Sequence, residues 1–190
     1  RYSNQLYGIF EPVLGIFERR GTPREPSEVG AHREDGYKVI VFGLGRFGTA
    51  IGMRLQKRGI KVLGVDFNAL AVRRWRDLGL DTEFGDATDP EFVGDLPLTE
   101  AEWIVSTVPI HPTGLSHEDT RTTLIQLTRT AGFRGRVAVA SHHPKDTEVL
   151  FGAGADIVLE PFQDAADRAV ALLCGAPEEE RTDIPVIQTE

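Results

Sequence analysis

The sequence predicts an α/β protein with a doubly wound Rossmann sheet, in which six parallel strands take the order 3-2-1-4-5-6, preceded by an N-terminal helical extension. Three observations predict this fold. A glycine-rich turn, GLGRFG, stands between an apolar run and an amphipathic run; an acidic residue closes the next apolar run; and short apolar runs then alternate with amphipathic runs to about residue 175. Short, uniformly apolar strands indicate a parallel sheet that helices cover on both faces.

The hydrophobic periodicity assigns the elements in chain order. Three helix starts are supported by residues that commonly cap helices, namely Asn68, Asp89 (followed by Pro90) and Asp119. We expect strands at residues 38–43, 61–66, 82–84, 102–107, 136–140 and 156–159. We expect helices at residues 46–58, 68–78, 89–95, 119–132, 145–152 and 162–174.

We divide the chain into four parts. Residues 1–20 place apolar side chains at helical spacing beside basic ones, which is typical of a juxtamembrane helix; a helix packed on its own domain or on a second subunit has the same pattern. Residues 21–36 are rich in Pro, Gly and charge and indicate a linker. Residues 37–175 form the Rossmann domain, and residues 176–190 form an acidic tail.

The glycine-rich turn carries the most specific signal. Gly43 allows a tight turn out of the first strand, Gly45 allows a pyrophosphate to approach the backbone, and Gly48 lets the helix pack on the sheet. The free N–H groups at the helix start favour a phosphate there. We therefore expect the whole turn to border phosphates, namely Gly43, Leu44, Gly45, Arg46, Phe47 and Gly48.

Asp66 supplies the second half of the fingerprint. It follows Gly48 by eighteen residues and closes the second apolar run, so it falls at the carboxyl end of the second strand. From there a carboxylate accepts hydrogen bonds from ribose hydroxyls and repels a 2′-phosphate. The prediction is a site for NAD(H) or an adenosine nucleotide such as AMP, and not for NADP(H). The alternative is a Rossmann turn that holds the fold and binds nothing.

Further candidate residues end at the same rim of the predicted sheet. Phe67 follows Asp66 directly, Asp86 and Ala87 follow the third strand, and Thr107 ends the fourth strand. Asp86 either bonds an adenine edge or fixes its own loop. Thr107 either offers a hydroxyl near the phosphates or caps its strand. In the glycine turn, Arg46 either pairs with a phosphate or lies in solvent.

Composition and motifs restrict the function. A formal net charge of −8 disfavours nucleic acid as a partner, because a phosphate backbone needs a basic surface. The single cysteine, Cys174, lies in an apolar helical run, and we expect it in the core. We find no catalytic motif and no chain length for a substrate domain. No metal-ligand spacing supports the loop histidines, which are His111, His117, His142 and His143.

With these motifs in place, the stretch from Tyr37 to about Cys174 resembles an RCK domain of the TrkA-N type, and it looks closest to the cytosolic domain of Kef-like potassium/proton antiporters. The matching segments are VIVFGLGRFGTAIGMRLQKRGIKVLGVDFN, GLDTEFGDATDPEF and ADIVLEPF. Residues 2–20 resemble the exit from the last membrane helix of such a transporter. One departure is Val108-Pro109, where many members carry an acid; it favours a mononucleotide such as AMP over full NAD(H).

The resemblance implies a non-catalytic regulatory domain that binds AMP or NAD(H), forms a homodimer and passes occupancy to a membrane transporter domain of the same polypeptide. Such a domain would lie at the cytoplasmic face of the cell membrane. Carried over by position, the glycine turn would hold phosphates and Asp66 the ribose, while Asp86 and Ala87 would border the adenine. Two alternatives stay open: a small NAD-dependent oxidoreductase, and a ligand-free dimerisation domain.

Overall fold

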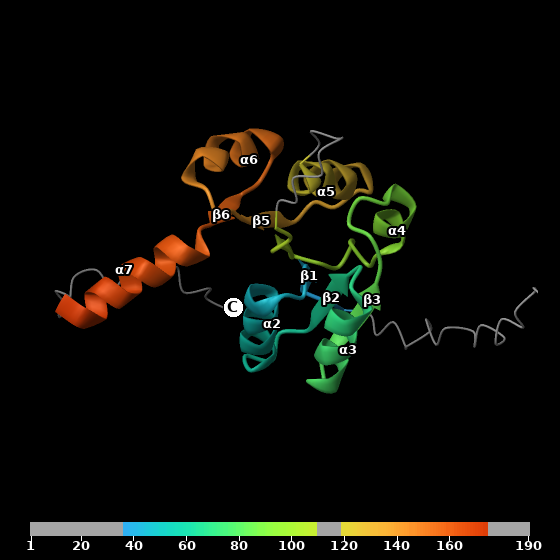
Figure 1. The fold of residues 1–190 in the computed structure, drawn as a ribbon. Coiled ribbons are helices and arrows are strands. Elements are labelled where there is room, and N and C mark those ends of the chain that lie inside the picture. Colours follow the sequence, from blue (N-terminus) through green and yellow to red (C-terminus); the bar gives the residue numbers. More distant parts are fainter. Residues whose placement is uncertain (1–35, 110–118, 175–190) are drawn as a thin grey trace, which may run out of the picture. The chain divides into compact units, whose positions relative to one another are not determined.

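The computed structural model describes residues 36–109 and 119–174 (Figure 1). The predicted juxtamembrane helix, nearly all of the predicted linker and the acidic tail lie outside these ranges, as do His111 and His117. Among the described residues, no helix combines the length and the apolar character needed to cross a membrane.

Six parallel strands form one sheet in the order β3-β2-β1-β4-β5-β6, which confirms the predicted doubly wound topology. The strand order reverses direction between β1 and β4, where a doubly wound sheet opens a crevice at its carboxyl edge. The strands are β1 (Val39–Phe42), β2 (Val62–Asp66), β3 (Asp81–Phe84), β4 (Trp103–Ser106), β5 (Arg136–Ala140) and β6 (Ile157–Leu159).

Helices cover both faces of the sheet. The described helices are α2 (Arg46–Gln56), α3 (Ala69–Asp77), α4 (Pro90–Asp95), α5 (Thr120–Thr130), α6 (Thr147–Ala153) and α7 (Pro161–Cys174), with a 3₁₀ turn, η1 (Pro144–Asp146), before α6; α7 does not cover the sheet. Figure 1 shows α2 and α3 on one side of the sheet and α4, α5 and α6 on the other.

Alternate residues of the strands feed two separate cores. On β1, Ile40 and Phe42 join the core under α4, α5 and α6, whereas Val39 and Val41 join the core under α2 and α3. Trp75 of α3 fills the second core and is fully buried. The uniformly apolar pattern of the central strands is thus explained by burial on both faces.

The predicted helix caps are confirmed. The side chains of Asn68, Asp89 and Asp119 accept hydrogen bonds from backbone N–H groups in the first turns of α3, α4 and α5. The predicted helix at 145–152 is divided, because η1 begins at Pro144 and α6 follows it only from Thr147.

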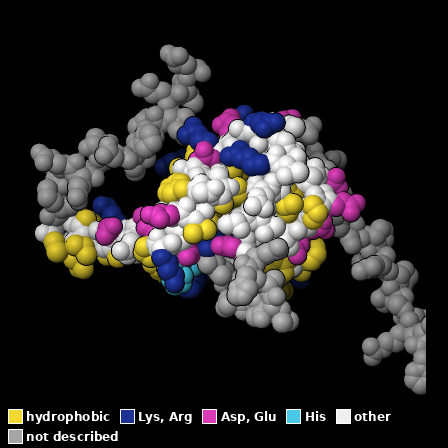
Figure 2. Space-filling model, turned by 90° about the horizontal axis from the view of Figure 1, so that it is seen from above, with side chains coloured by type: hydrophobic (Ala, Val, Ile, Leu, Met, Phe, Trp, Pro, Cys, Tyr) yellow, Lys and Arg dark blue, Asp and Glu magenta, His cyan; other side chains and the backbone are white. Residues whose placement is uncertain are grey.

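The last helix departs from expectation. No residue of α7 is buried, and Phe162, Val170, Leu172 and Leu173 are exposed. Cys174 is exposed as well, so its predicted place in the core is wrong. The apolar run predicts the helix correctly, but its apolar face stays exposed, apart from a ring contact between Phe162 and His142. Figure 2 shows these hydrophobic side chains along α7.

Two glycines bring α2 against the sheet. Gly43 has φ +88°, a conformation that residues with a Cβ rarely adopt. A Cβ at position 48 would overlap the Gly43 carbonyl oxygen and stand 2.8 Å from Thr107 Oγ1. The first turn of α2 therefore lies as close to the end of β1 as a glycine permits.

This contact predicts that Gly48→Ala lowers the free energy of unfolding by about 2 kcal/mol, because the added methyl group has no space. The measurement is urea denaturation of the 190-residue chain. Gly152→Ala is the matched control, since position 152 is also helical and has no atom within 4 Å of the added Cβ. Equal stability of both variants would contradict the close packing of α2.

Candidate functional site

A cavity of about 410 Å³ opens at the carboxyl edge of the sheet, beside the reversal between β1 and β4. Of the predicted site residues, it is lined by Gly43, Asp66, Phe67, Asp86 and Ala87. The other lining residues are not among the predicted site residues, although Val108 and Pro109 form the pair at which the sequence departs from the family pattern. These other residues are Val65, Gly85, Thr88, Val108, Pro109 and Thr120. Most of the lining is apolar, and among the described residues that line the cavity only Asp66 and Asp86 carry a charge, so the cavity can hold a flat apolar group beside a hydroxylated one.

Asp66 fixes the glycine turn from the neighbouring strand. Its Oδ2 atom accepts a hydrogen bond of 2.7 Å from the Leu44 backbone N–H. Its Oδ1 atom accepts a hydrogen bond of 2.8 Å from the Asn68 backbone N–H, which sets the start of α3. Each carboxylate oxygen has two acceptor sites, so one remains on each oxygen. Asp66 therefore holds the turn and can still accept hydrogen bonds from a ligand in the cavity.

Two further hydroxyl groups hold the same turn. Thr107 donates a hydrogen bond of 2.7 Å from Oγ1 to the Gly43 carbonyl oxygen. Thr49 donates one of 3.0 Å from Oγ1 to the Leu44 carbonyl oxygen, and accepts one of 2.7 Å from the Trp75 indole N–H. Thr107 does not line the cavity; its hydroxyl bonds β1, as in the strand-capping alternative. The turn is thus fixed by β2, β4 and α2 together.

The start of α2 presents free donors. Gly45 is the N-cap residue, and no side chain caps the helix there. The first N–H groups of a helix have no partner within the helix. Arg46 is exposed and forms no ion pair with any described residue. Donors and a positive charge therefore lie next to Gly43, the part of the turn that borders the cavity.

Two residues of the predicted turn lie away from the cavity. The Leu44 side chain is buried in the core under α2 and α3, so only its backbone faces the turn. Phe47 lines a different groove, on the face of the sheet beside α2. Asp86 accepts hydrogen bonds of 2.8 Å from the backbone N–H and the hydroxyl of Thr88, so it fixes its own loop while also lining the cavity.

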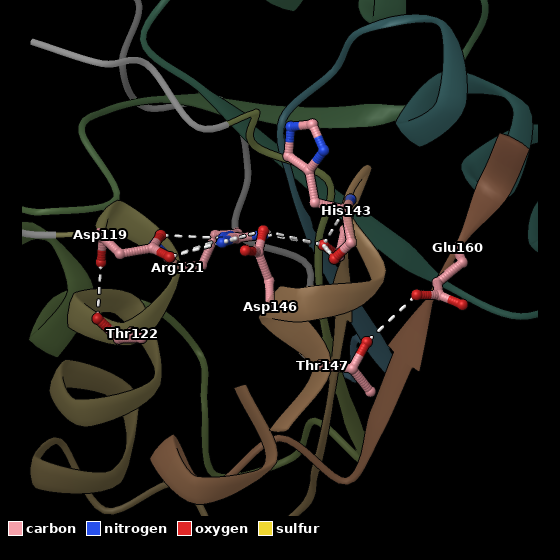
Figure 3. Close-up of polar contacts among 8 residues, drawn as sticks. Asp119, Arg121, Thr122, His143, Asp146, Thr147 and Glu160 are labelled. Atoms are coloured by element: carbon pink, nitrogen blue, oxygen red, sulfur yellow. Dashed lines mark hydrogen bonds and ion pairs between the residues drawn. The ribbon is translucent and has the colours of Figure 1, made fainter. Parts of the chain in front are cut away.

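A buried arginine holds the wall of the cavity at α5, and sequence reasoning missed it. The Arg121 side chain is 3% exposed and pairs with Asp119 at 2.6 Å and with Asp146 at 3.1 Å. It thereby joins the start of α5 to the segment after β5 (Figure 3). Thr120, beside it in the chain, lines the cavity. A charged residue inside an amphipathic helix gives no sequence signal of burial, because its partner at 146 is distant in the chain.

The ionisation of this cluster is set by its pairing. Burial alone raises the pKa of Asp119, but the hydrogen bonds and charge of Arg121 outweigh burial and hold that pKa below its usual value. Burial alone lowers the pKa of Arg121, and the hydrogen bonds and charges of Asp119 and Asp146 reverse this effect and raise it. Both groups are therefore charged at neutral pH.

The two described histidines lie apart from the cavity. His142 is exposed, and its ring lies 5.0 Å from that of Phe162 on α7. His143 contributes its backbone to the cluster, donating from its N–H to the Ser141 hydroxyl oxygen. Within the described ranges, no three Asp, Glu, His or Cys side chains stand close enough together to hold a metal ion.

A parallel sheet in this order, with a glycine-rich turn after β1 and an acid at the end of β2, defines a Rossmann domain of the nucleotide-binding type. Within that class, the sequence matches one particular domain family. Residues 39–161 match the TrkA-N domain family, and the chain belongs to this family.

The chain is also similar to individual proteins. It is 30% identical over 109 residues to the glutathione-regulated potassium-efflux system protein KefC of Salmonella arizonae, a match that covers 56% of this chain and 17% of KefC. The solved TrkA-N domain of the inner membrane protein ybaL from Escherichia coli is 19% identical, with a TM-score of 0.62 over 74% of this chain and 98% of that domain.

Channel proteins contain the same fold. The GsuK channel bound to NAD is 17% identical and has a TM-score of 0.56, covering 82% of this chain and 27% of that one. A further GsuK structure is bound to ADP. The resemblance to RCK domains of the TrkA-N type is thus confirmed at the level of family and fold.

Removal of the buried cation tests the Arg121 cluster. We expect Arg121→Leu to lower the free energy of unfolding at pH 7 by about 3 kcal/mol, because two carboxylates lose their partner. Because pairing depresses the pKa of Asp119, its contribution is present above the unfolded pKa of about 3.9 and is lost as the pH falls below it.

The difference in stability between Arg121→Leu and the unmodified chain should therefore shrink below about pH 4, in urea denaturations at several pH values. Arg134→Leu is the control, since Arg134 is exposed and forms no ion pair with any described residue. A difference that stays constant from pH 7 to acid would show that Arg121 acts through packing alone.

Proposed function

We propose that this chain is the cytosolic regulatory domain of a monovalent cation (K⁺)/proton antiporter, and that it binds an adenine nucleotide and passes occupancy to transport. The observation that carries the proposal is the convergence of the glycine turn, Asp66 and an apolar cavity at one edge of the sheet. The family match and the similarity to KefC support the role in potassium transport. NAD and ADP in the GsuK structures support a nucleotide as the ligand class.

The cavity suits an adenosine. Its volume of about 410 Å³ and its apolar wall, which includes Val65, Ala87 and Val108, match a flat aromatic base. Phe67 is 63% exposed beside it, so its ring is available for stacking. Asp66 lines the same cavity and holds the glycine turn, so its remaining acceptor sites can accept hydrogen bonds from the ribose of a bound adenosine.

The phosphates would lie at the start of α2. The uncapped N–H groups after Gly45 and the positive end of the helix dipole stabilise an anion there, and Arg46 can add a charge-assisted hydrogen bond. AMP and NAD(H) both meet this arrangement. A 2′-phosphate would stand next to the Asp66 carboxylate, so we expect NADP(H) to bind more weakly.

We further propose that the domain works as a homodimer joined by α7. Beside α2, an apolar groove of about 510 Å³ is lined by Phe47, Ile51, Leu55, Trp103 and others. Only Glu160 separates β6 from α7, which leaves no loop for this helix to fold back over its own sheet. The exposed apolar face of α7 therefore suits the groove of a second copy.

A nucleotide can regulate this domain only if it binds two conformational states of the domain with different affinities. A nucleotide in the cavity would contact the ends of β1, β2 and β4 and the start of α5. The groove proposed for α7 uses β1, β4 and α2 of the same domain. Occupancy would therefore favour one dimer arrangement over another, and the segment before β1 would carry that change to the transporter domain at the cytoplasmic face of the membrane.

This proposal assigns no catalysis to the chain, in keeping with the potassium-efflux and channel proteins that it resembles. If the chain were instead an NAD-dependent oxidoreductase, the nicotinamide absorbance would change when a hydroxy- or keto-substrate is added. The ligand-free alternative predicts that no nucleotide changes the melting temperature.

Titration with AMP, ADP, NAD⁺ and NADP⁺ tests nucleotide binding. We expect AMP or NAD⁺ at a hundred-fold excess over Kd to add about 2.7 kcal/mol of stability, read as a rise in melting temperature, and NADP⁺ to add less. Unchanged melting with every nucleotide at millimolar concentration would contradict the proposal.

The substitution Phe67→Ala tests where the adenine base binds. We expect it to raise the Kd for AMP by about ten-fold or more, because base stacking is lost, while the melting temperature without ligand stays the same. Phe84→Ala is the matched control, because Phe84 is equally an exposed phenylalanine but does not line the cavity. Equal effects of both substitutions on Kd would place the base elsewhere.

Leu173→Glu tests the dimer. Leu173 is 84% exposed on α7, and burial of such a side chain contributes about 1.5–3 kcal/mol, so we expect self-association to weaken at least about ten-fold in sedimentation equilibrium. Gln163→Glu adds the same charge to the same helix outside the apolar face and should leave association unchanged. A dimer that Leu173→Glu does not weaken would exclude α7 from the interface.

A further inference from the structure

The charges of the described domain are strongly segregated along the chain. Residues 43–79 contain eight Lys or Arg and two Asp, whereas residues 80–102 contain eight Asp or Glu and neither Lys nor Arg. A chain with a net charge of −8 thus carries a markedly cationic segment at residues 43–79, which comprises α2, β2 and α3.

The fold gathers these cations at one end of the domain. Helices α2 and α3 lie side by side, and both end at the amino edge of the sheet (Figure 1). Gln56 at the end of α2 donates a hydrogen bond of 2.8 Å to the carbonyl oxygen of Gly79, just after α3. We call the exposed cations here the cationic end; they are Arg54, Lys57, Arg58, Arg73, Arg74 and Arg76.

These six side chains are not neutralised within the domain. None of them forms an ion pair with a described residue, whereas Lys38, Arg121 and Arg129 each do. Exposed acids stand nearby at Asp77 and Asp81, and they leave a clear excess of positive charge. Helix dipoles favour cations in the last turns and at the cap, at Arg54, Lys57, Arg74 and Arg76, but these dipoles do not account for Arg73.

The cationic end lies where the preceding chain enters the fold. Val39 begins β1 and pairs with Val62 at the amino edge of β2. The backbone N–H of Lys38 donates to the carbonyl oxygen of Lys61, the residue that joins α2 to β2. The chain that precedes the domain therefore joins it at the cationic edge, while the cavity opens at the opposite edge of the sheet.

We propose that the cationic end docks on the anionic phospholipid headgroups of the membrane. Clustered Lys and Arg are attracted to an acidic lipid surface, and the net negative charge of the rest of the chain orients the domain with this end toward it. Docking at the amino edge leaves the cavity open to solution. The inference builds on the proposed membrane-attached role, but it does not depend on nucleotide binding.

The test is flotation of the 190-residue chain with vesicles of phosphatidylcholine containing phosphatidylglycerol, and with vesicles of phosphatidylcholine alone. We expect binding only to the anionic vesicles and loss of binding at high salt. The double variant Lys57→Glu/Arg58→Glu should bind at least about twenty-fold more weakly, because each cation near the surface contributes a factor of about five. Lys145→Glu/Arg168→Glu changes the net charge equally, away from the cationic end, and should retain binding.

Three outcomes would overturn the proposal. The first is no binding to anionic vesicles. The second is equal binding by both double variants, which would assign lipid binding to residues 1–20 or to charge in general. The third is a change in sedimentation of Lys57→Glu/Arg58→Glu without vesicles, which would show that the cationic end faces another protein chain. A nucleotide melting shift measured on the same samples separates these failures from failure of the nucleotide site.

Discussion

The hydrogen bond from the Leu44 backbone N–H to the Asp66 carboxylate is the contact on which the site depends. It ties the turn after β1 to the end of β2, and the second oxygen of the same carboxylate fixes the start of α3 through Asn68. Thr49 and Thr107 hold the two carbonyl oxygens of the turn from other elements. The turn is consequently shaped before any ligand arrives, which reduces the cost of ordering it on binding.

This arrangement gives Asp66 a structural role beside the ribose-binding role that we propose, and a substitution cannot separate the two. Loss of the carboxylate would remove the proposed acceptor for a ribose hydroxyl, and it would also leave the Leu44 N–H without its partner. The side chains that only line the cavity, such as Phe67, report binding more cleanly. The Arg121 cluster is distinct from the proposed ligand site, because Arg121 holds the position of α5 and does not itself line the cavity.

The topology and the position of the site follow from local patterns in the sequence. Glycine spacing, the delayed acid and the helix caps each act over a few residues and need no knowledge of distant contacts. The features that the sequence did not predict depend on contacts between residues that are far apart in the chain. Phe47 turns to the groove beside α2, Arg121 is buried by a partner on another loop, and α7 remains exposed although its apolar run predicts burial. Periodicity identifies an apolar face, but it does not state what covers that face.

The most direct test of the central claim is residue-resolved NMR of the chain during titration with AMP. We expect the backbone amide signals of Gly45, Arg46, Phe67 and Ala87 to shift together with one Kd, while those of residues 56–60 at the opposite edge stay in place. Shifts confined to the opposite edge, or no shift at the glycine turn with AMP in excess, would contradict this claim.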